Sequence, residues 1–351
     1  MDFVPLIDAI GEPATALAGG VVLGAVFGIA AQRSRFCTRS AVIDLVRDGD
    51  RRAFAVWAAG FATALLAVQM MLHLGELSVA ETRFFSSVQS LSGAVVGGLV
   101  FGVGMAMTRG CVSRLAVLAA SGNLRALFGV LVVALFGYLT FAGALIPVRD
   151  AVAGLLTTGS TGGNDLLAFG GFGRPVGIVL GIAALLAALA VAALSKASPA
   201  RFLGGVGVGL AVAGGWWFTW QLSTQVFDPV QVESLSFVRP FATTLMLAAG
   251  MLGTVAIDQG LLIGTISGAG LAAVASGDFR IVTFSEPGAP GILRYATGAA
   301  LMGFGGILAV GCTVGAGLTG GSVLALSSVM ALLAMMFGAA LADRAIDAPK
   351  R

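Results

Sequence analysis

The chain has 351 residues, of which 58% are hydrophobic and only 11% are charged, and its mean hydropathy is +0.98. A soluble globular protein has about a quarter of its residues charged, so this composition excludes that class. The formal net charge of +3 gives no indication of a nucleic-acid partner. The apolar runs last about 17 to 22 residues, which is typical of membrane-spanning helices and excludes a closed barrel. We predict an all-α polytopic membrane protein.

The first apolar run, residues 14–31, leads into a strongly basic segment. Six arginines lie between residues 33 and 52, whereas the N-terminus carries Asp2, Asp8 and Glu12. Because positive residues favour the cytoplasmic side, we expect the N-terminus to face outward. The acidic start also lacks the basic region of a cleaved signal peptide, so the first run is expected to remain as a span.

Three further runs complete the first half of the chain, at residues 53–74, 91–108 and 126–146. The following segment is rich in Gly, Thr and Ser and extends to Gly173. We expect it to be an extracytoplasmic linker, residues 148–173, between an N-terminal half-repeat, residues 1–147, and a C-terminal half-repeat, residues 174–351.

The second half is predicted to begin with spans at 175–195, 202–220 and 241–257. The tryptophans at 216, 217 and 220 are expected at the headgroup level, where such rings are enriched. Residues 261–276 are apolar but short, so we expect a re-entrant half-helix there. A run that ends at Cys312 and a last run, 322–341, bring the C-terminus to the cytoplasm.

One glycine-rich element occurs twice in the sequence. The glycines at 97, 102, 104 and 110 recur at 298, 303, 305 and 311, and each copy ends in a cysteine, Cys111 and Cys312. Four predicted spans separate the copies, so they should run in opposite directions, as an inverted repeat requires. The expected architecture is about nine transmembrane helices plus re-entrant half-helices.

The three cysteines are candidates for a substrate pathway. Their number is odd and none forms a C-x-x-C pair, so we expect free thiols. If the helices ending at Gly110-Cys111 and Gly311-Cys312 are broken near the midplane, the thiols face each other and the following helix N-termini favour an anion. A thiol is a weak donor and acceptor, which suits repeated weak binding. The alternative is that these cysteines are small buried hydrophobes.

Basic residues beside the thiols are candidates for a supporting anion site. Arg33 and Arg39 flank Cys37, and Arg109 and Arg114 flank Cys111. Arginines attract anions, and in the membrane they are costly and often functional. The alternatives are that they set the topology or extend along the helices to the membrane surface.

With these motifs in view, the sequence resembles the YeeE/YedE family of sulfur-compound, or thiosulfate, transporters. The likeness covers nearly the whole chain and rests on the segment Arg33 to Cys37, the two Gly-Cys helix ends, Gly277 to Arg280 and Ser236 to Pro240. The resemblance implies an hourglass-shaped inverted repeat in which Cys37, Cys111 and Cys312 contact thiosulfate through transient S–H···S interactions. It also implies delivery to a small cytoplasmic sulfur-transfer protein of the TusA-like type. Arg109 and the basic segment from Arg33 to Arg39 depart from the family pattern.

We therefore predict a transporter of a sulfur-containing anion in the bacterial inner membrane, and not an enzyme. The chain has no G-x-x-x-x-G-K-[ST] motif for ATP, and no cofactor or metal is expected. Three alternatives remain: a membrane sulfur-relay enzyme that forms a cysteine persulfide, a selenium-compound transporter, and a soft-metal transporter, since thiolates bind Cu(I).

Overall fold

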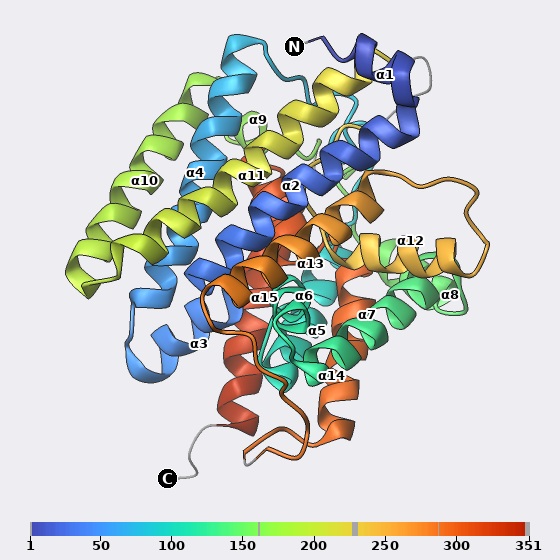
Figure 1. Ribbon diagram of the computed structural model, residues 1–351. Coiled ribbons are helices and arrows are strands. Elements are labelled where there is room, and N and C mark those ends of the chain that lie inside the picture. The colour runs from blue at the N-terminus through green and yellow to red at the C-terminus, as the bar shows by residue number, and fades with distance from the viewer. Residues whose placement is uncertain (1, 161, 227–230, 287, 348–351) are drawn as a thin grey trace.

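The computed structural model of the protein (Figure 1) describes residues 2–160, 162–226, 231–286 and 288–347, and these ranges contain helices but no strand. The helices are α1 (Val4–Ile10), α2 (Glu12–Ser34), α3 (Thr38–Asp48), α4 (Arg52–Leu74), α5 (Leu91–Thr108), α6 (Val112–Ala120), α7 (Leu124–Ala142), α8 (Ile146–Ala153), α9 (Leu166–Phe169), α10 (Pro175–Ser195), α11 (Pro199–Ser223), α12 (Val238–Ala248), α13 (Ile257–Ala275), α14 (Ile292–Leu308), the π-helix η1 (Thr313–Gly320) and α15 (Leu326–Ile346).

Nine segments within the described ranges are long and apolar enough to cross a membrane, which confirms the predicted fold class. Six are single helices: α4, α7, α10, α11, α13 and α15. The other three each consist of a long helix, a break and a shorter helix: α2 with α3, α5 with α6, and α14 with η1. The N-terminal and C-terminal ends of the described chain lie at opposite ends of this helix bundle (Figure 1).

The predictions for residues 241–276 were wrong. The expected span at 241–257 is the short helix α12, which stops before Gly250 takes a positive φ of 72°. The expected half-helix is α13, a continuous helix of 19 residues that qualifies as a span. Its Gly260 does not end an element. The glycine instead lets the backbone of α13 approach that of α2, where a Cβ would collide with the carbonyl of Leu17.

Glycines at every fourth position bring α2 and α13 together. Gly20, Gly24 and Gly28 of α2 face the backbone of α13. In turn, the backbone of α2 is faced by Gly260, Gly264 and Gly268 of α13. Glycines so spaced share one helix face, so two helices running in parallel make a close contact without side chains between them. This pairing, visible in Figure 1, joins the two halves of the sequence.

The two copies of the glycine-rich repeat, α5 and α14, pack against each other in opposite directions. A Cβ on Gly97, near the start of α5, would meet the backbone of Ala309, just after the end of α14. A Cβ on Gly104, further along α5, would meet the carbonyl of Gly298 in the first half of α14. The predicted reversal of direction is confirmed, and the four spans between the copies are α7, α10, α11 and α13.

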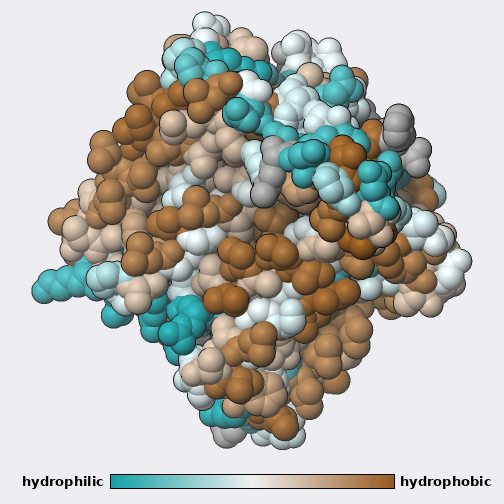
Figure 2. All heavy atoms as spheres, turned by 45° about the horizontal axis from the view of Figure 1, so that its top comes forward, coloured by the Kyte–Doolittle hydropathy of each residue, from teal (hydrophilic) through white to brown (hydrophobic). Residues whose placement is uncertain are grey.

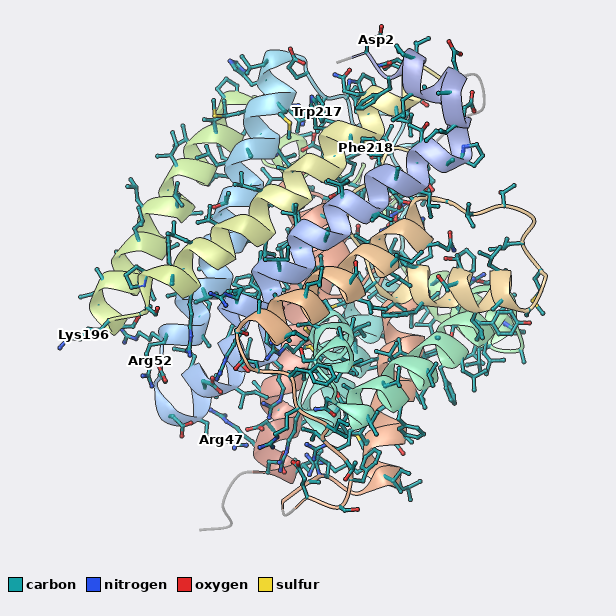
Figure 3. All side chains as sticks on the ribbon, viewed as in Figure 1. Asp2, Arg47, Arg52, Lys196, Trp217 and Phe218 are labelled. Atoms are coloured by element: carbon teal, nitrogen blue, oxygen red, sulfur yellow. The ribbon has the colours of Figure 1, made fainter. Side chains whose placement is uncertain are left out.

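The sequence predicted that the tryptophans at 216, 217 and 220 lie at the headgroup level, but not all of them do. Trp216 is completely buried, and its indole Nε1 donates at 3.3 Å to the hydroxyl of Ser322. Trp217 and Phe218 lie near the end of the bundle that carries Asp2 (Figure 3), where both rings contact Phe3 edge-on. Helix periodicity explains the difference, because adjacent residues of α11 point in different directions.

The surface separates into apolar and polar zones. Figure 2 shows hydrophobic residues over much of the visible flank, with hydrophilic residues gathered at the end that is turned forward. Arg47, Arg52 and Lys196 lie away from the end that carries Asp2 (Figure 3). We call the end of the bundle with these three basic residues the basic end, and the end with Asp2 the N-terminal end.

Candidate functional site

The three cysteines occupy the same kind of backbone turn. In each broken span the long helix ends at a non-glycine residue with positive φ, at 56° for Arg35, 57° for Arg109 and 58° for Val310. Two residues later the chain is extended at Cys37, Cys111 or Cys312, and that cysteine is the N-cap residue of the next helix. Left-handed non-glycine residues cost energy and cluster at functional sites.

The cysteines are free and buried. Cys111 and Cys312 have no exposed surface and Cys37 is 6% exposed. The thiols of Cys37 and Cys111 interact with each other, and the sulfur of Cys111 also lies 3.4 Å from the hydroxyl of Ser113. The sulfur of Cys312 accepts from the backbone N–H of Gly315 at 3.4 Å. Two thiols therefore form a pair, and the third belongs to the opposed repeat copy.

A cavity of about 210 Å³, the Arg114 vestibule, opens near the Cys37 and Cys111 pair at the basic end. Its lining is Gln32, Arg35, Arg114, Leu118, Ser121, Asn123, Asp278, Arg280 and Val282. Arg114 interacts electrostatically with both thiols, and one buried nitrogen of its guanidinium, Nη1, has no hydrogen-bond partner. A buried donor without a partner is costly, so this nitrogen is available to an anionic ligand.

A second cavity, of about 170 Å³, opens beside Cys312 towards the N-terminal end, and we call it the Arg83 vestibule. Its lining is Arg83, Phe141, Arg149, Ser236, Arg239, Gly306, Ile307, Val310 and Gly311. Arg83 interacts electrostatically with Cys312, and the hydroxyl of Ser236 is buried without a partner. Helix α7 begins beside the first vestibule and ends beside the second, so about 28 Å separates its two ends.

The predicted supporting arginines divide into two groups. Arg114 faces the thiols, and Arg39 interacts with Cys37 while its guanidinium lies 3.5 Å from the carboxylate of Asp343. Arg33 is exposed. Arg109 is also exposed, and it donates at 3.0 Å to the carbonyl of Gly288, so its side chain turns away from Cys111.

The two glycines that precede the repeat cysteines have different roles. Gly311 has a φ of 153°, and a Cβ there would lie 2.5 Å from the backbone nitrogen of Ala316. A side chain is therefore excluded. Gly110 has no positive φ, and the atom nearest to its Cβ would be in the side chain of Leu115, at 3.2 Å.

A fourth break lies before α12, and the sequence predictions placed no site residue there. Residues 232–237 are buried and not helical, and the hydroxyl of Thr319 donates at 2.7 Å to the carbonyl of Leu235. Non-helical backbone at membrane depth needs such internal partners. The break contributes Ser236 and Arg239 to the Arg83 vestibule. Both belong to the motif Ser236 to Pro240, which the sequence resemblance singled out without assigning a role.

Similarity to known proteins agrees with this geometry. Residues 33–341 match the family described as sulphur transport. The chain is 29% identical over 309 residues to a thiosulfate transporter, TsuA, of Spirochaeta thermophila, with 84% of this chain and 88% of the relative covered. It is 25% identical over 318 residues to the thiosulfate transporter TsuA of Escherichia coli, with 84% and 85% covered. The matched region contains all three broken spans from Arg33 onward, the three cysteines and, apart from Gln32, the residues that line both vestibules. The chain therefore belongs to the sulphur transport family, as a multi-pass membrane transporter and not an enzyme.

Proposed function

We propose that this protein carries thiosulfate across the bacterial inner membrane and that Cys37, Cys111 and Cys312 contact the anion in turn. The observation that supports this most directly is that three buried cysteines occupy the N-cap positions of three helices between two vestibules lined by arginine. The names of the two relatives support thiosulfate as the substrate.

The chemistry of the site suits a passing anion. Helix N-termini carry partial positive charge, and those of α3, α6 and η1 begin directly after the cysteines. A neutral thiol is cheap to bury and donates only weakly, so it orients a sulfur-bearing anion without holding it tightly. Weak successive sites permit conduction, whereas one tight site would trap the ion.

The orientation and the partner are also part of the proposal. With Arg47, Arg52 and Lys196 at one end, the positive-inside rule favours the basic end in the cytoplasm and the N-terminus outside. Thiosulfate would then arrive in the Arg83 vestibule and leave by the Arg114 vestibule, where a small cytoplasmic sulfur-transfer protein of the TusA-like type would receive it.

Uptake of labelled thiosulfate by cells lacking their own thiosulfate transporters tests the role of the thiols. We expect Cys111→Ala and Cys312→Ala each to reduce uptake more than tenfold at equal membrane abundance. Ser267→Ala is the matched control, because Ser267 lies on α13 and its hydroxyl bonds only to the backbone of its own helix. Normal uptake in both cysteine variants would refute the thiol pathway.

Mass spectrometry separates transport from the sulfur-relay alternative. The proposal predicts that purified protein incubated with thiosulfate gains no mass on any cysteine, because the S–H contacts are not covalent. A persulfide on Cys37, Cys111 or Cys312 that a cytoplasmic acceptor removes would favour the relay enzyme instead.

A further inference from the structure

A four-membered charge network lies behind the Arg83 vestibule. Glu233 and Asp258 are 5% and 9% exposed, and Arg239 pairs with both carboxylates, at 3.2 Å in the case of Asp258. The Nε of Arg83 lies 4.0 Å from Oε2 of Glu233. The network joins the loop before α5, the fourth break, α12 and α13, so it connects both halves of the chain.

The arginines and the carboxylates of this network face different spaces. Arg83 and Arg239 line the vestibule beside Cys312, whereas Glu233 and Asp258 line a smaller cavity of about 20 Å³ on their other side. A cavity of this size holds about one water molecule. The carboxylates therefore lie between the anion vestibule and a space that can hold a water molecule.

The charges of the network cancel, and this matters for an incoming anion. Arg83 and Arg239 supply two positive charges, and Glu233 and Asp258 supply two negative charges. An anion that pairs with these arginines adds net negative charge to a buried site that already holds two carboxylates. Buried like charges repel strongly, and protonation of one carboxylate relieves the repulsion.

Hydrogen bonding distinguishes the two carboxylates. Both oxygens of Asp258 accept, from Arg239 and, at 3.1 Å, from the hydroxyl of Thr243. Glu233 accepts at Oε1 from Arg239, but its buried Oε2 has no hydrogen-bond partner, and neither does the buried Nε of Arg83 opposite. Oε2 of Glu233 is therefore the atom on which a proton displaces no existing hydrogen bond.

We propose that Glu233 is a proton-binding site that couples anion entry to proton uptake. When the anion pairs with Arg83 and Arg239, one proton from water at the N-terminal end binds Oε2 of Glu233, and the proton returns to that water when the anion moves on. No electron transfer is involved. This inference rests on the proposed function, because it assumes that an anion uses the Arg83 vestibule.

The surroundings of Glu233 contain few other groups that titrate. Arg83 faces it from the loop before α5, Arg239 from α12 and Asp258 from α13. The other neighbours are uncharged: Thr219 of α11, whose hydroxyl donates to the backbone carbonyl of Glu233, and Gly20 of α2. A change in proton binding on anion entry is therefore expected to centre on Glu233.

Calorimetry of thiosulfate binding to purified protein, in buffers that differ in ionisation enthalpy, measures protons taken up per anion bound. For the unaltered protein we expect about one proton. Glu233→Gln should still bind thiosulfate but take up none, whereas Asp258→Asn should retain the uptake. Glu76→Gln is the control, because Glu76 is an exposed carboxylate that follows α4 at the N-terminal end.

The outcomes separate this inference from the function on which it rests. Thiosulfate binding by the unaltered protein without proton uptake would overturn the inference alone. Undiminished proton uptake by Glu233→Gln, or its loss in Asp258→Asn but not in Glu233→Gln, would overturn the assignment to Glu233. Absence of any thiosulfate binding by the unaltered protein would overturn the proposed function and the inference with it.

The unaltered protein also provides a test that needs no variant. The number of protons bound per thiosulfate should fall to zero below the pH at which Glu233 is already protonated without the anion, and an uptake that does not change with pH would overturn the inference.

Discussion

The two vestibules are both lined by arginines, but their arginines are neutralised differently. In the Arg83 vestibule, Arg239 is held between two buried carboxylates, and Arg83 lies 4.0 Å from one of them. In the Arg114 vestibule, neither Arg114 nor Arg35 forms an ion pair within the described residues, and Asp278 is the only carboxylate in the lining. The Arg114 vestibule therefore presents two arginines, Arg35 and Arg114, without an ion-pair partner in the described part of the chain, whereas Arg83 and Arg239 of the Arg83 vestibule each lie within 4.0 Å of a carboxylate.

This difference favours anion binding in the Arg114 vestibule over anion binding in the Arg83 vestibule. Two charges about 4 Å apart interact by about 4 kcal/mol at the effective dielectric constant of partly buried sites. An anion must compete with such pairs at Arg239, but at Arg114 it meets a nitrogen without a partner. The comparison predicts stronger anion binding at the basic end, and each prediction below tests one part of it.

The largest effect is expected from removal of Arg239. In Arg239→Ala two buried carboxylates lose their partner, which costs about 3–5 kcal/mol, so we expect little folded protein or a sharply lowered Tm in detergent. Arg174→Ala is the control, since Arg174 is about half exposed in its pair with Asp165 and such pairs contribute less than about 1 kcal/mol. Equal stability of the two variants would show that the buried network does not support the fold.

The next effect concerns the two cysteine turns. Gly311→Ala places a side chain where φ is 153° and where Cβ meets the backbone of Ala316, so strain of about 1–3 kcal/mol distorts the turn that carries Cys312. We expect uptake to fall more than tenfold. Gly110→Ala should retain most of its uptake, because Leu115 can shift its side chain. Equal losses in both variants would mean that the turns tolerate side chains alike.

The turns also show what the sequence alone could predict. Glycine spacing and the cysteines revealed the repeat, and counting spans gave its reversed direction, although one span was assigned to residues 241–257 and not to α13. That error arose because the apolar run 261–276 is short for a span, whereas α13 begins already at Ile257 and its Gly260 contacts α2. Which glycine breaks a helix and which joins two depends on the neighbouring helix, and that neighbour lies far away in the sequence.

Only part of the candidate site could be predicted, because some of its residues also come together from segments far apart in the sequence. The thiols are rare residues at repeated positions, so the sequence singles them out. Arg35, Arg109 and Val310 share a left-handed conformation that no common side chain signals. The sequence singled out Arg109 as an anion ligand, since it is close to Cys111 in the sequence, and gave no role to Arg83. In the fold Arg109 is exposed and Arg83 approaches Cys312 from more than two hundred residues away.

Removal of Arg114 tests the unpaired vestibule directly. Because its buried nitrogen has no partner in the protein, Arg114→Ala should leave the fold intact but weaken binding of the proposed thiosulfate substrate. A hydrogen bond to a charged group contributes about 1.5–3 kcal/mol, so the Kd should rise at least about tenfold. Calorimetry measures the Kd, with the exposed Arg33→Ala as the control. An unchanged Kd in Arg114→Ala would remove Arg114 from the pathway.

The smallest effect is expected from removal of an ion pair near the surface of the basic end, that of Arg294 with Asp347. Arg294 donates to both carboxylate oxygens of Asp347, at 2.9 and 2.6 Å, and this bond lowers the pKa of Asp347. A carboxyl whose pKa is lower in the folded state than its unfolded value, about 3.9, stabilises the fold above that pH, and the contribution is lost as the pH falls through the folded pKa. Asp347→Asn should therefore lower Tm by about 1–2 °C at pH 7 and by less at pH 3.5, a difference set by a pair that contributes about 1 kcal/mol at most. If Asp347→Asn lowered Tm as much as Arg239→Ala, burial would not be what makes the network beside Cys312 different.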